Sequence, residues 1–297
     1  MRLLLIGGTG QVGSEILALT KENDIECISP SSSELNVTEQ HFIEDFLTTN
    51  LPIDFIVNAS AYTAVDKAED DIELAFKINR DGPQYLAAAC VQHKIPLLHI
   101  STDYVFDGSA TTPYSEEMTI HPLGVYGASK AKGEQAIRDC LSEHIILRTA
   151  WVYGANGNNF VKTMLRLGKD RPQLSVVSDQ MGCPTAAADI AKTIINIVEQ
   201  MANKPDNRWG TYHYCSKGST NWADFAKAIF TKVKAIDNDY PSVSVTPILT
   251  SEYPTKAARP AYSVLDCAKI KHNFDISSLE WSISLHQNIP NILKNIQ

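Results

Sequence analysis

The residues best suited to chemistry are a tyrosine and a lysine four positions apart, Tyr126 and Lys130, which follow an apolar segment ending in Ser101-Thr102-Asp103. On a helix, this spacing places both side chains on one face, one turn apart. An ammonium beside a phenol favours the phenolate and lowers the tyrosine pKa from about 10. A hydroxyl from Thr102 would hold the oxygen that receives the proton. The pattern therefore predicts a Thr/Tyr/Lys set for proton transfer to or from a carbonyl oxygen.

The beginning of the chain decides whether this pair is more than packing, since a Tyr-x-x-x-Lys pair alone usually means a packed ring and a solvated amine. The apolar segment Met1–Ile6 runs into GGTGQVG, and a helical pattern follows from Ser14 to Glu22. Glycines let the backbone approach a pyrophosphate, which then lies on the free N–H groups of the helix N-terminus. The order strand, glycine-rich turn and helix therefore predicts a dinucleotide site.

Apolar segments alternate with helical patterns through the first half of the chain. We expect strands at Met1–Ile6, Ile25–Ser29, Ile53–Asn58, Leu97–Ile100 and Ile145–Thr149. This rhythm predicts an α/β fold, a Rossmann-type doubly wound parallel sheet with crossover helices. Ligands of such sheets bind outside the carboxyl ends of the strands, so the segments that follow these strands should line one cleft.

Beyond Thr149 the order of elements is less regular. Helical patterns cover Asn158–Leu167, Asp189–Met201 and Trp222–Ile236, and SDQMGCPT is expected to be a loop. We predict a dinucleotide-binding domain of residues 1–150 plus about 185–215. A smaller, interleaved α/β substrate lobe would take about 151–184 plus 216–297.

Composition excludes several classes of protein. The 297 residues are 44% hydrophobic, enough for a large core, and 26 Lys and Arg stand against 34 Asp and Glu, a net charge of −8. The chain has neither a basic cluster for nucleic acid nor an apolar run near the ~20 residues that span a bilayer. Its six cysteines are scattered without metal-like spacing. We expect a cytoplasmic protein that binds neither nucleic acid nor membranes.

Four motifs, GGTGQVG, STDYVFDG, YGASK and RTAWVYG, together resemble the extended short-chain dehydrogenase/reductases over nearly the full length. NASAYTAVDKAE, GNNFVKTMLRL, SDQMGCPT and Arg259-Pro260 look most like the members that reduce 4-keto-6-deoxy sugars attached to dTDP. The resemblance implies reduction of the C4 ketone of such a nucleotide sugar by NADPH or NADH, with dTDP-L-rhamnose as the product.

The resemblance also implies roles for single residues. Tyr126 would donate the proton, Lys130 would be its partner and a cofactor contact, and Thr102 would orient the substrate oxygen. Asp103 and Trp151 would touch the sugar nucleotide, although Trp151 could equally pack between the lobes. Asn79 matches an Asn that fixes the active-site geometry in the wider superfamily. The cofactor contacts that we expect are Gly7, Gly10, Gln11, Val12, Gly13, Asn36, Ala61, Tyr62, Thr63 and Lys130.

Two features depart from the family. An acid that would repel a 2′-phosphate is missing from Ser29–Ser33 after the second strand, so we expect NADPH to be used at least as well as NADH. Some relatives dimerise through a metal held by acids from two helices. Glu15 is present, but the matching later position is Ala188, and Asp189 is displaced by one residue, ~100° around a helix. We therefore expect no metal, and a homodimer stays open.

Two other functions remain as alternatives. A dehydratase or epimerase of the same superfamily is one, but its dehydratases place Asp-Glu after the Thr, whereas Asp103 is followed by Tyr104 here. A dinucleotide-binding regulatory subunit, like that of some methionine adenosyltransferases, is the other. The intact Thr102, Tyr126 and Lys130 favour catalysis, and NAD(P)H oxidation with a 4-keto sugar nucleotide would distinguish these functions.

Overall fold

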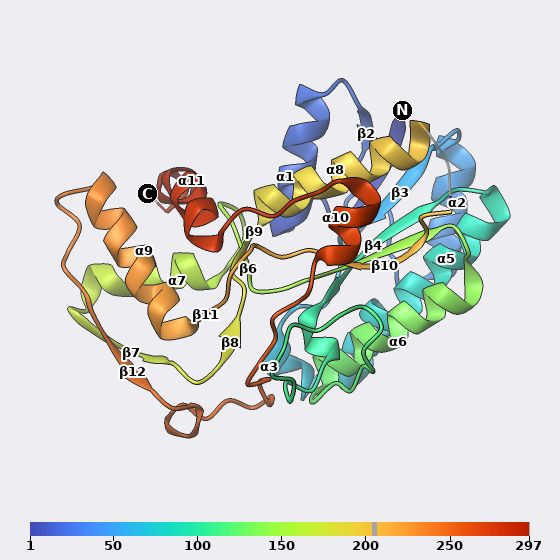
Figure 1. Cartoon of the computed structure of the whole chain (residues 1–297). Coiled ribbons are helices and arrows are strands. Elements are labelled where there is room, and N and C mark those ends of the chain that lie inside the picture. The colour runs from blue at the N-terminus through green and yellow to red at the C-terminus, as the bar shows by residue number, and fades with distance from the viewer. Residues whose placement is uncertain (204–206, 297) are drawn as a thin grey trace.

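The computed structural model describes residues 1–203 and 207–296 and shows two lobes (Figure 1). In the larger lobe, the described residues form a six-stranded parallel sheet in the order β10-β5-β4-β3-β1-β2. Its strands are β1 (Arg2–Ile6), β2 (Glu26–Ile28), β3 (Phe55–Asn58), β4 (Leu97–Thr102), β5 (His144–Thr149) and β10 (Gly210–His213). The strand order reverses between β1 and β3, which is where doubly wound sheets bind ligands. The predicted fold class is confirmed.

Helices cover both faces of this sheet, as near-continuous apolar strands require. One face packs against α1 (Gln11–Glu22), α8 (Ala187–Asn203) and α10 (Ala268–Phe274). The other packs against α2 (Gln40–Asn50), α5 (Gly82–His93) and α6 (Val125–Cys140). Because α8 and β10 come late in the chain yet complete the first lobe, the two lobes are interleaved (Figure 1).

The helical pattern before His93 is interrupted. It follows a short α3 (Val65–Ala68) and consists of α4 (Ile72–Phe76), a π-helical turn (Lys77–Asp81) and then α5. Pro83 stands in the first turn of α5, where its missing N–H costs little. The helical segment is therefore interrupted by a wide turn just before Gly82-Pro83.

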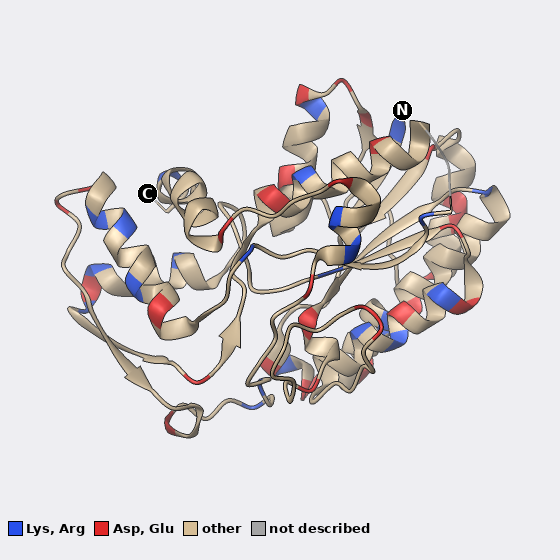
Figure 2. Ribbon diagram, in the orientation of Figure 1, with Lys and Arg blue, Asp and Glu red and all other residues tan. Residues whose placement is uncertain are grey.

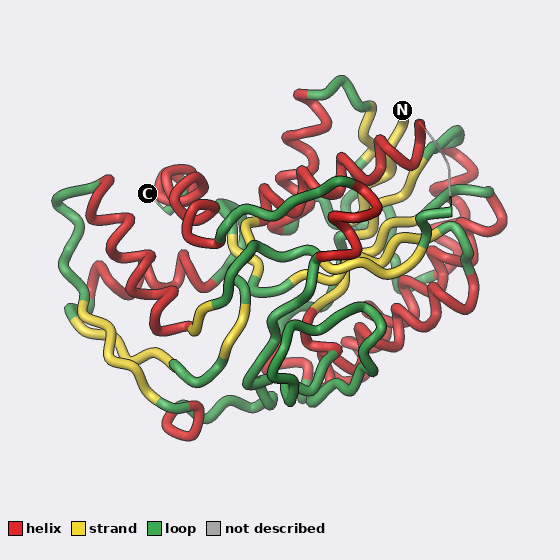
Figure 3. The backbone as a smooth tube through the Cα atoms, in the orientation of Figure 1, coloured by secondary structure: helices red, strands yellow, loops and turns green. Residues whose placement is uncertain are grey.

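The smaller lobe has its own core, built on three helices: α7 (Phe160–Asp170), α9 (Trp222–Ile236) and α11 (Trp281–Lys294). Its short strand pairs are visible in Figure 3. They are β7 (Gln173–Val177) with β12 (Ser244–Ile248), β8 (Met181–Gly182) with β11 (Thr220–Asn221), and β6 (Val152–Tyr153) with β9 (Thr185–Ala186). The SDQMGCPT segment, expected to be a loop, thus contains β8. The reason is pairing with a distant strand, which no local pattern reveals.

Charged side chains of both signs lie on the helices and loops of both lobes, while the sheet strands carry few (Figure 2). Asn221 is the N-cap of α9, and its Oδ1 accepts from the N–H of Asp224 at 2.8 Å. Among the residues that the structure describes, no helix is long and apolar enough to cross a membrane.

Candidate active site

The glycine-rich turn after β1 has no room for side chains. A Cβ on Gly7, whose φ is +84°, would lie 2.7 Å from the Ser60 backbone N, and one on Gly13 would lie 2.1 Å from the Gly7 O. The Gly10 N–H donates to the Gly7 O at 3.0 Å, and Gly10 is the N-cap of α1. The N–H groups of Gln11 and Val12 follow in the first helical turn, where they lack intrahelical partners. This turn can therefore hold an anionic pyrophosphate.

Asn79 fixes the Ala61–Thr63 segment, which forms the wall beside this turn, through hydrogen bonds. Its Oδ1 accepts from the N–H of Tyr62 at 2.8 Å, and its Nδ2 donates to the Tyr62 O at 3.1 Å and to Ser129 Oγ at 3.0 Å. Asn79 thus ties the Ala61–Thr63 segment after β3 to α6, and it reaches both from the π-helical turn. Asn79 is buried, so it shapes the site from behind.

The expected ribose end of the cofactor site lies after β2. Ser29 packs so close to Gly8 that a Cβ there would lie 2.1 Å from Ser29 Oγ. The Glu34 carboxylate accepts from the Ser31 N–H at 2.8 Å and from Ser31 Oγ at 2.7 Å, and these bonds lower the pKa of Glu34. Asn36 Oδ1 accepts from the N–H and hydroxyl of Thr38. The acid nearest the strand end is therefore engaged within its own turn, and cofactor binding by Asn36 stays a prediction.

Thr102 and Tyr126 meet at the carboxyl end of β4. The Thr102 hydroxyl donates to Asp103 Oδ1 at 3.0 Å, and it lies close enough to the phenol of Tyr126 to lower the pKa of that phenol. The ring of Tyr104 packs edge-on against that of Tyr126, with centroids 5.5 Å apart. Burial raises the pKa of the Tyr126 phenol above its ordinary value, and Thr102 offsets only part of the shift. The lowered phenol pKa expected from the sequence is therefore wrong for the protein as described here.

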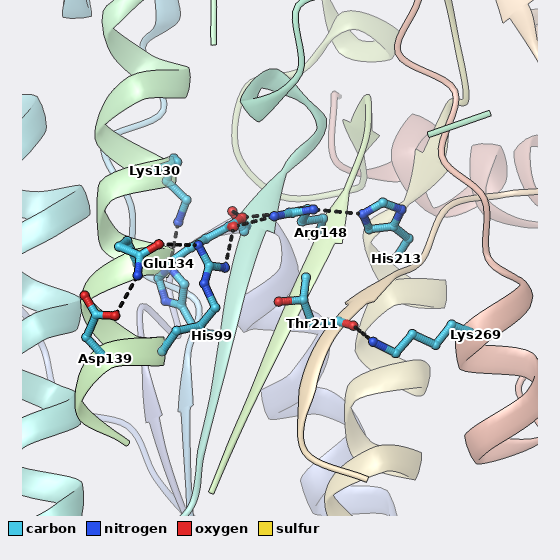
Figure 4. A network of polar contacts seen from close by, with 11 residues as sticks. His99, Lys130, Glu134, Asp139, Arg148, Thr211, His213 and Lys269 are labelled. Carbon is cyan, nitrogen blue, oxygen red and sulfur yellow. Dashed lines mark hydrogen bonds and ion pairs between the residues drawn. The ribbon is translucent and has the colours of Figure 1, made fainter. Parts of the chain in front are cut away.

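The reason lies in the direction of the Lys130 side chain. The Lys130 side chain is only 1% exposed. Its Nζ lies 3.0 Å from His99 Nε2 and donates to the Ile100 O at 2.7 Å (Figure 4). Lys130 thus points into β4, although the helical spacing from Tyr126 is as expected. Burial lowers the pKa of Lys130 to about 8, and the nearby Glu134 carboxylate partly offsets this effect.

The two expected substrate contacts differ in their surroundings. Asp103 is 2% exposed, and burial raises the pKa of its carboxyl to about 6 although the hydroxyls of Ser263 and Thr102 lower it. Trp151 adopts a left-handed φ of +46° after β5. Its ring stacks on Trp222 of α9, with centroids 3.4 Å apart and planes 5° apart. Trp151 therefore packs against the start of α9, and its contact with substrate stays a prediction.

Arg259 reaches the site from the C-terminal part of the chain. Its Nη2 pairs with Asp66 Oδ2 at 2.6 Å, and its guanidinium carbon lies 5.8 Å from the centre of the Tyr104 ring. The Tyr104 ring in turn packs on Tyr126. The resemblance pointed to Arg259-Pro260 without giving it a role, and in the structure only the Tyr104 ring stands between this arginine and Tyr126.

A buried ion pair lies one helical turn beyond Lys130 and was missed by the sequence analysis (Figure 4). Glu134 accepts from Arg148 Nε at 2.9 Å and Nη2 at 2.6 Å, and from Ser101 Oγ at 2.6 Å. Arg148 Nη1 lies 3.3 Å from His213 Nε2. Burial alone would raise the pKa of Glu134, but the bonds and charge of Arg148 hold it below its ordinary value. The available signal was an arginine inside the apolar segment IILRT, since a buried charge needs a partner.

Asp189 and Glu15, the two acids considered as metal ligands, lie in different surroundings. Asp189 is 6% exposed and accepts from Ser284 Oγ at 2.5 Å, so it faces the protein interior. Burial raises the pKa of Glu15, which lies near Lys192. Over residues 1–203 and 207–296, no group of three metal-ligating side chains comes together. The expectation that no metal binds stays a prediction.

Comparisons with known proteins agree over nearly the whole chain. A family model described as "RmlD substrate binding domain" matches residues 1–294. The dTDP-4-dehydrorhamnose reductase of Aggregatibacter actinomycetemcomitans is 43% identical over 288 residues, covering 96% of this chain and 97% of the relative. A crystal structure of a dTDP-4-dehydrorhamnose reductase from Clostridium acetobutylicum has a TM-score of 0.91 at 38% identity, covering 99% of this chain and 100% of that one. The Bacillus anthracis reductase in complex with NADP has a TM-score of 0.90 at 34% identity, covering 97% and 98%.

Proposed function

We propose that Thr102, Tyr126 and Lys130 carry out the reduction catalysed by this chain, which belongs to the RmlD substrate binding domain family. The reaction is the NADPH-dependent reduction of dTDP-4-dehydrorhamnose in dTDP-rhamnose synthesis. The substrate is a nucleotide sugar whose C4 ketone becomes an alcohol, with dTDP-L-rhamnose as the product. The reductase predicted from the sequence is thereby confirmed. The observation that supports the residue roles best is that Thr102, at the end of β4, acts on the pKa of the Tyr126 phenol beside the glycine turn.

The residues around the glycine turn fit NADPH. Gly7 and Gly13 keep the turn free of side chains, and the first turn of α1 offers N–H groups to the pyrophosphate. Ala61, Tyr62 and Thr63 form the adjacent wall, which Asn79 fixes in place. When bound, the cofactor supplies a hydride to C4 of the sugar.

Tyr126 is the proton donor of this proposal. Its pKa is raised by burial, so the phenol carries its proton before the substrate enters, as a general acid must. Thr102 lies beside the same phenol and would hold the substrate oxygen, where negative charge develops. Lys130 is buried one helical turn away, and its charge would favour loss of the phenolic proton once it turned toward Tyr126.

The sugar nucleotide would lie between the lobes. Asp103 follows Thr102 directly and is a candidate partner for a sugar hydroxyl, and Trp151 is a candidate surface for the sugar or the thymine. Both residues flank the Thr102 and Tyr126 pair, one after β4 and one after β5.

The proposal is tested by replacing the acid. Tyr126→Phe should lower kcat by at least ~10²-fold, the scale of losing a general acid. The Kd for NADPH should stay nearly unchanged, since the phenol does not hold the nucleotide. NADPH oxidation is followed with dTDP-4-dehydrorhamnose made by the upstream enzymes, and the product sugar is identified by NMR. A variant with near wild-type turnover would remove Tyr126 from this role.

The same assay addresses the two alternatives. A dehydratase or epimerase would convert a sugar nucleotide without net consumption of NADPH, and a regulatory subunit would bind NADPH without turnover. Tyr104 occupies the position after Asp103 where the superfamily's dehydratases have a second carboxyl, and its ring is packed against Tyr126. This arrangement supports simple reduction.

The proposal also covers the domain organisation, the cellular location and the oligomeric state of the protein. Separate apolar cores support a dinucleotide-binding domain of residues 1–150 plus about 185–215 and a substrate lobe of about 151–184 plus 216–297, except that α10 of the second range packs on the sheet of the first domain. A cytoplasmic location fits a biosynthetic oxidoreductase whose six cysteines are free. Light scattering after gel filtration distinguishes a monomer from the homodimer that the resemblance allows.

A further inference from the structure

Three buried polar side chains form a row that ends at Lys130. Asn58 at the end of β3 lies against His99 of β4, with 3.1 Å between Asn58 Nδ2 and His99 Nδ1. His99 Nε2 lies 3.0 Å from Lys130 Nζ, as Figure 4 shows for these two residues. Asn58 and His99 are 0% exposed and Lys130 1%, so these side chains are closed off from bulk water. Each donor and acceptor in the row must therefore be matched by its neighbour.

The orientation of the Asn58 amide sets the first match. Its Oδ1 accepts from the backbone N–H of Ser60 at 3.0 Å and from Ser60 Oγ at 2.6 Å. A backbone N–H can only donate, so the oxygen of the amide must face Ser60. The Nδ2 group, which can only donate, is left facing His99, and His99 Nδ1 must accept from it.

The remaining matches follow along the row. A neutral imidazole has one N–H, so a His99 that accepts at Nδ1 carries its proton on Nε2. That N–H points at Lys130 Nζ, which must then accept, as a neutral amine can and an ammonium cannot. The amine keeps its own bond to the Ile100 O at 2.7 Å. A charged Lys130 can only donate. It would face the N–H of His99 Nε2, or, if that proton moved to Nδ1, the Nδ1–H would face the donor Nδ2 of Asn58.

We propose that Asn58 and His99 are positioning residues that hold Lys130 as a neutral amine in the cofactor-free enzyme at mildly alkaline pH, and that the neutral Lys130 takes up a proton from solvent when the cofactor binds. The proposal rests on the proposed function, in which Lys130 contacts the cofactor. Once Nζ is protonated it can no longer accept from His99 Nε2. Protonation therefore releases the side chain from His99 and frees it to turn toward the cofactor and Tyr126.

The charged groups around Lys130 are compatible with a neutral amine. Glu134, one turn on in α6, is bound by Arg148 of β5 and by Arg138, so its charge is already balanced. Asn79 of the π-helical turn is neutral, and Tyr126 keeps its proton because burial raises its pKa. Burial lowers the pKa of Lys130 to about 8 and that of His99 far below its ordinary value.

The free enzyme allows a direct test by ¹⁵N NMR of the histidine side chains. We expect His99 to be the Nε2–H tautomer, with an unprotonated Nδ1, in the free enzyme at pH values above about 8, where Lys130 is a neutral amine. A His99 that carries its proton on Nδ1 would overturn the proposal.

Calorimetric titration of NADPH in pairs of buffers with different ionisation enthalpies counts the protons taken up. With a Lys130 pKa of about 8 before binding and an ordinary value near 10.4 after it, uptake should be about half a proton per NADPH at pH 8, rising toward one at pH 9. An uptake near zero at both pH values would contradict the proposal.

Two variants change the row in defined ways. Asn58→Asp keeps the acceptor toward Ser60 but presents a second oxygen to His99, so Nδ1 becomes the donor, Nε2 becomes an acceptor and Lys130 can stay charged. Proton uptake should then disappear. His99→Gln should reduce uptake, because its amide can turn an oxygen toward an ammonium. His286→Gln, on an exposed histidine of α11, is the matched control and should keep the wild-type uptake.

These readouts separate the inference from the proposed function, since none requires turnover. A wild-type enzyme that reduces the nucleotide sugar but shows the Nδ1–H tautomer sinks the inference alone. An enzyme with the expected tautomer and proton uptake, but without reduction of the sugar, sinks the residue roles instead. Wild-type uptake in a folded Asn58→Asp variant would also overturn the inference.

Discussion

Asp103 is a carboxyl group whose burial opposes its charge. Its pKa is raised to about 6 in the folded protein, against about 3.9 in an unfolded chain. As the pH rises, the Asp103 carboxyl therefore loses its proton in the unfolded state before it does so in the folded state. The stability that the protonated carboxyl contributes is fully present below about pH 3.9 and is lost as the pH rises through about 6. A shift of about two units corresponds to roughly 3 kcal/mol above pH 7.

Replacing the charge without changing the shape should recover this stability. We expect Asp103→Asn to melt several degrees higher than wild type at pH 8, and at the same temperature near pH 4, by calorimetry across pH. Asp45→Asn, on an exposed position of α2, should change neither value. An Asp103→Asn variant that is less stable than wild type at pH 8 would mean that the carboxylate is stabilised where it lies.

Trp151 has two roles to separate, contact with substrate and packing on Trp222. Trp151→Ala removes both, so we expect a lower melting temperature and a KM for the sugar nucleotide raised about ten- to hundredfold. Trp222→Leu removes the same stacking but keeps the Trp151 indole, and should lower the melting temperature with a smaller change in KM. The Kd for NADPH should be unchanged in both variants. Equal KM values in the two variants would make Trp151 a packing residue only.

At the scale of residues, spacing alone predicted that Tyr126 and Lys130 share a helical face and that Thr102 ends a strand. It could not predict the partner of Lys130, because His99 is 31 positions away and meets it only through the packing of α6 on β4. The same limit explains the wrong expectation for the Tyr126 pKa. Proximity along a helix is local, whereas burial is set by the rest of the chain.

At the scale of elements, α6 lies directly on the π-helical turn at Gly133. A Cβ added there would lie 2.0 Å from the Asn79 O, which is backbone and cannot yield as a side chain tip would. Gly133→Ala should therefore push the two elements apart and destabilise the protein by about 1–3 kcal/mol. Because Asn79 Nδ2 bonds Ser129 of α6, kcat should fall as well.

Thermal unfolding and steady-state kinetics measure both effects of Gly133→Ala. Lys132→Ala, on the exposed face of the same helix, is the control and should leave melting temperature and kcat close to wild type. A Gly133→Ala variant of wild-type stability would show that the contact between α6 and the π-helical turn is looser than described.

The sequence predicted most elements because their patterns are local. Strand and helix bounds lie within a few residues of those expected, as for α9 and its Asn221 cap. The π-helical turn and the two-residue strands were not predicted. A wide turn is set by the packing of Asn79 and Gly133, and a strand as short as β8 is defined only by its partner, β11.

At the scale of the whole molecule, a buried chain of hydrogen bonds joins the lobes. Tyr153 OH of β6 lies 3.3 Å from Ser284 Oγ of α11, which donates to Asp189 Oδ2 of α8 at 2.5 Å. Unfolding one lobe would leave buried polar groups of the other without partners. We therefore expect a single calorimetric unfolding transition for the full chain.

Binding of NADPH should move that transition as a unit. At a hundred times its Kd, the cofactor should stabilise the protein by about 2.7 kcal/mol, since it binds only the folded state. Calorimetry with and without NADPH measures this shift. Two transitions, of which NADPH moves only one, would show that the lobes unfold independently despite the interleaved chain.

The overall architecture followed from the alternation of strands and helices, which fixes a parallel sheet and its ligand-binding edge. The relation between the lobes was harder to predict. The return of β10 to the sheet beside β5 depends on a pairing between His213 and Arg148 that spans 65 residues. Contacts over such distances are settled by the shape of the assembled core.

The stacked indoles of Trp151 and Trp222 also provide an intrinsic spectroscopic signal that depends on how the two rings lie relative to each other. One ring follows a sheet strand and the other begins a helix of the substrate lobe, in face-to-face contact at 3.4 Å. Two aromatic chromophores this close couple their electronic transitions, which produces a paired signal of opposite sign in circular dichroism and alters their fluorescence. Any ligand that separates or tilts the two rings would weaken that coupling, so a movement of Trp151 relative to α9 can be followed without an added label.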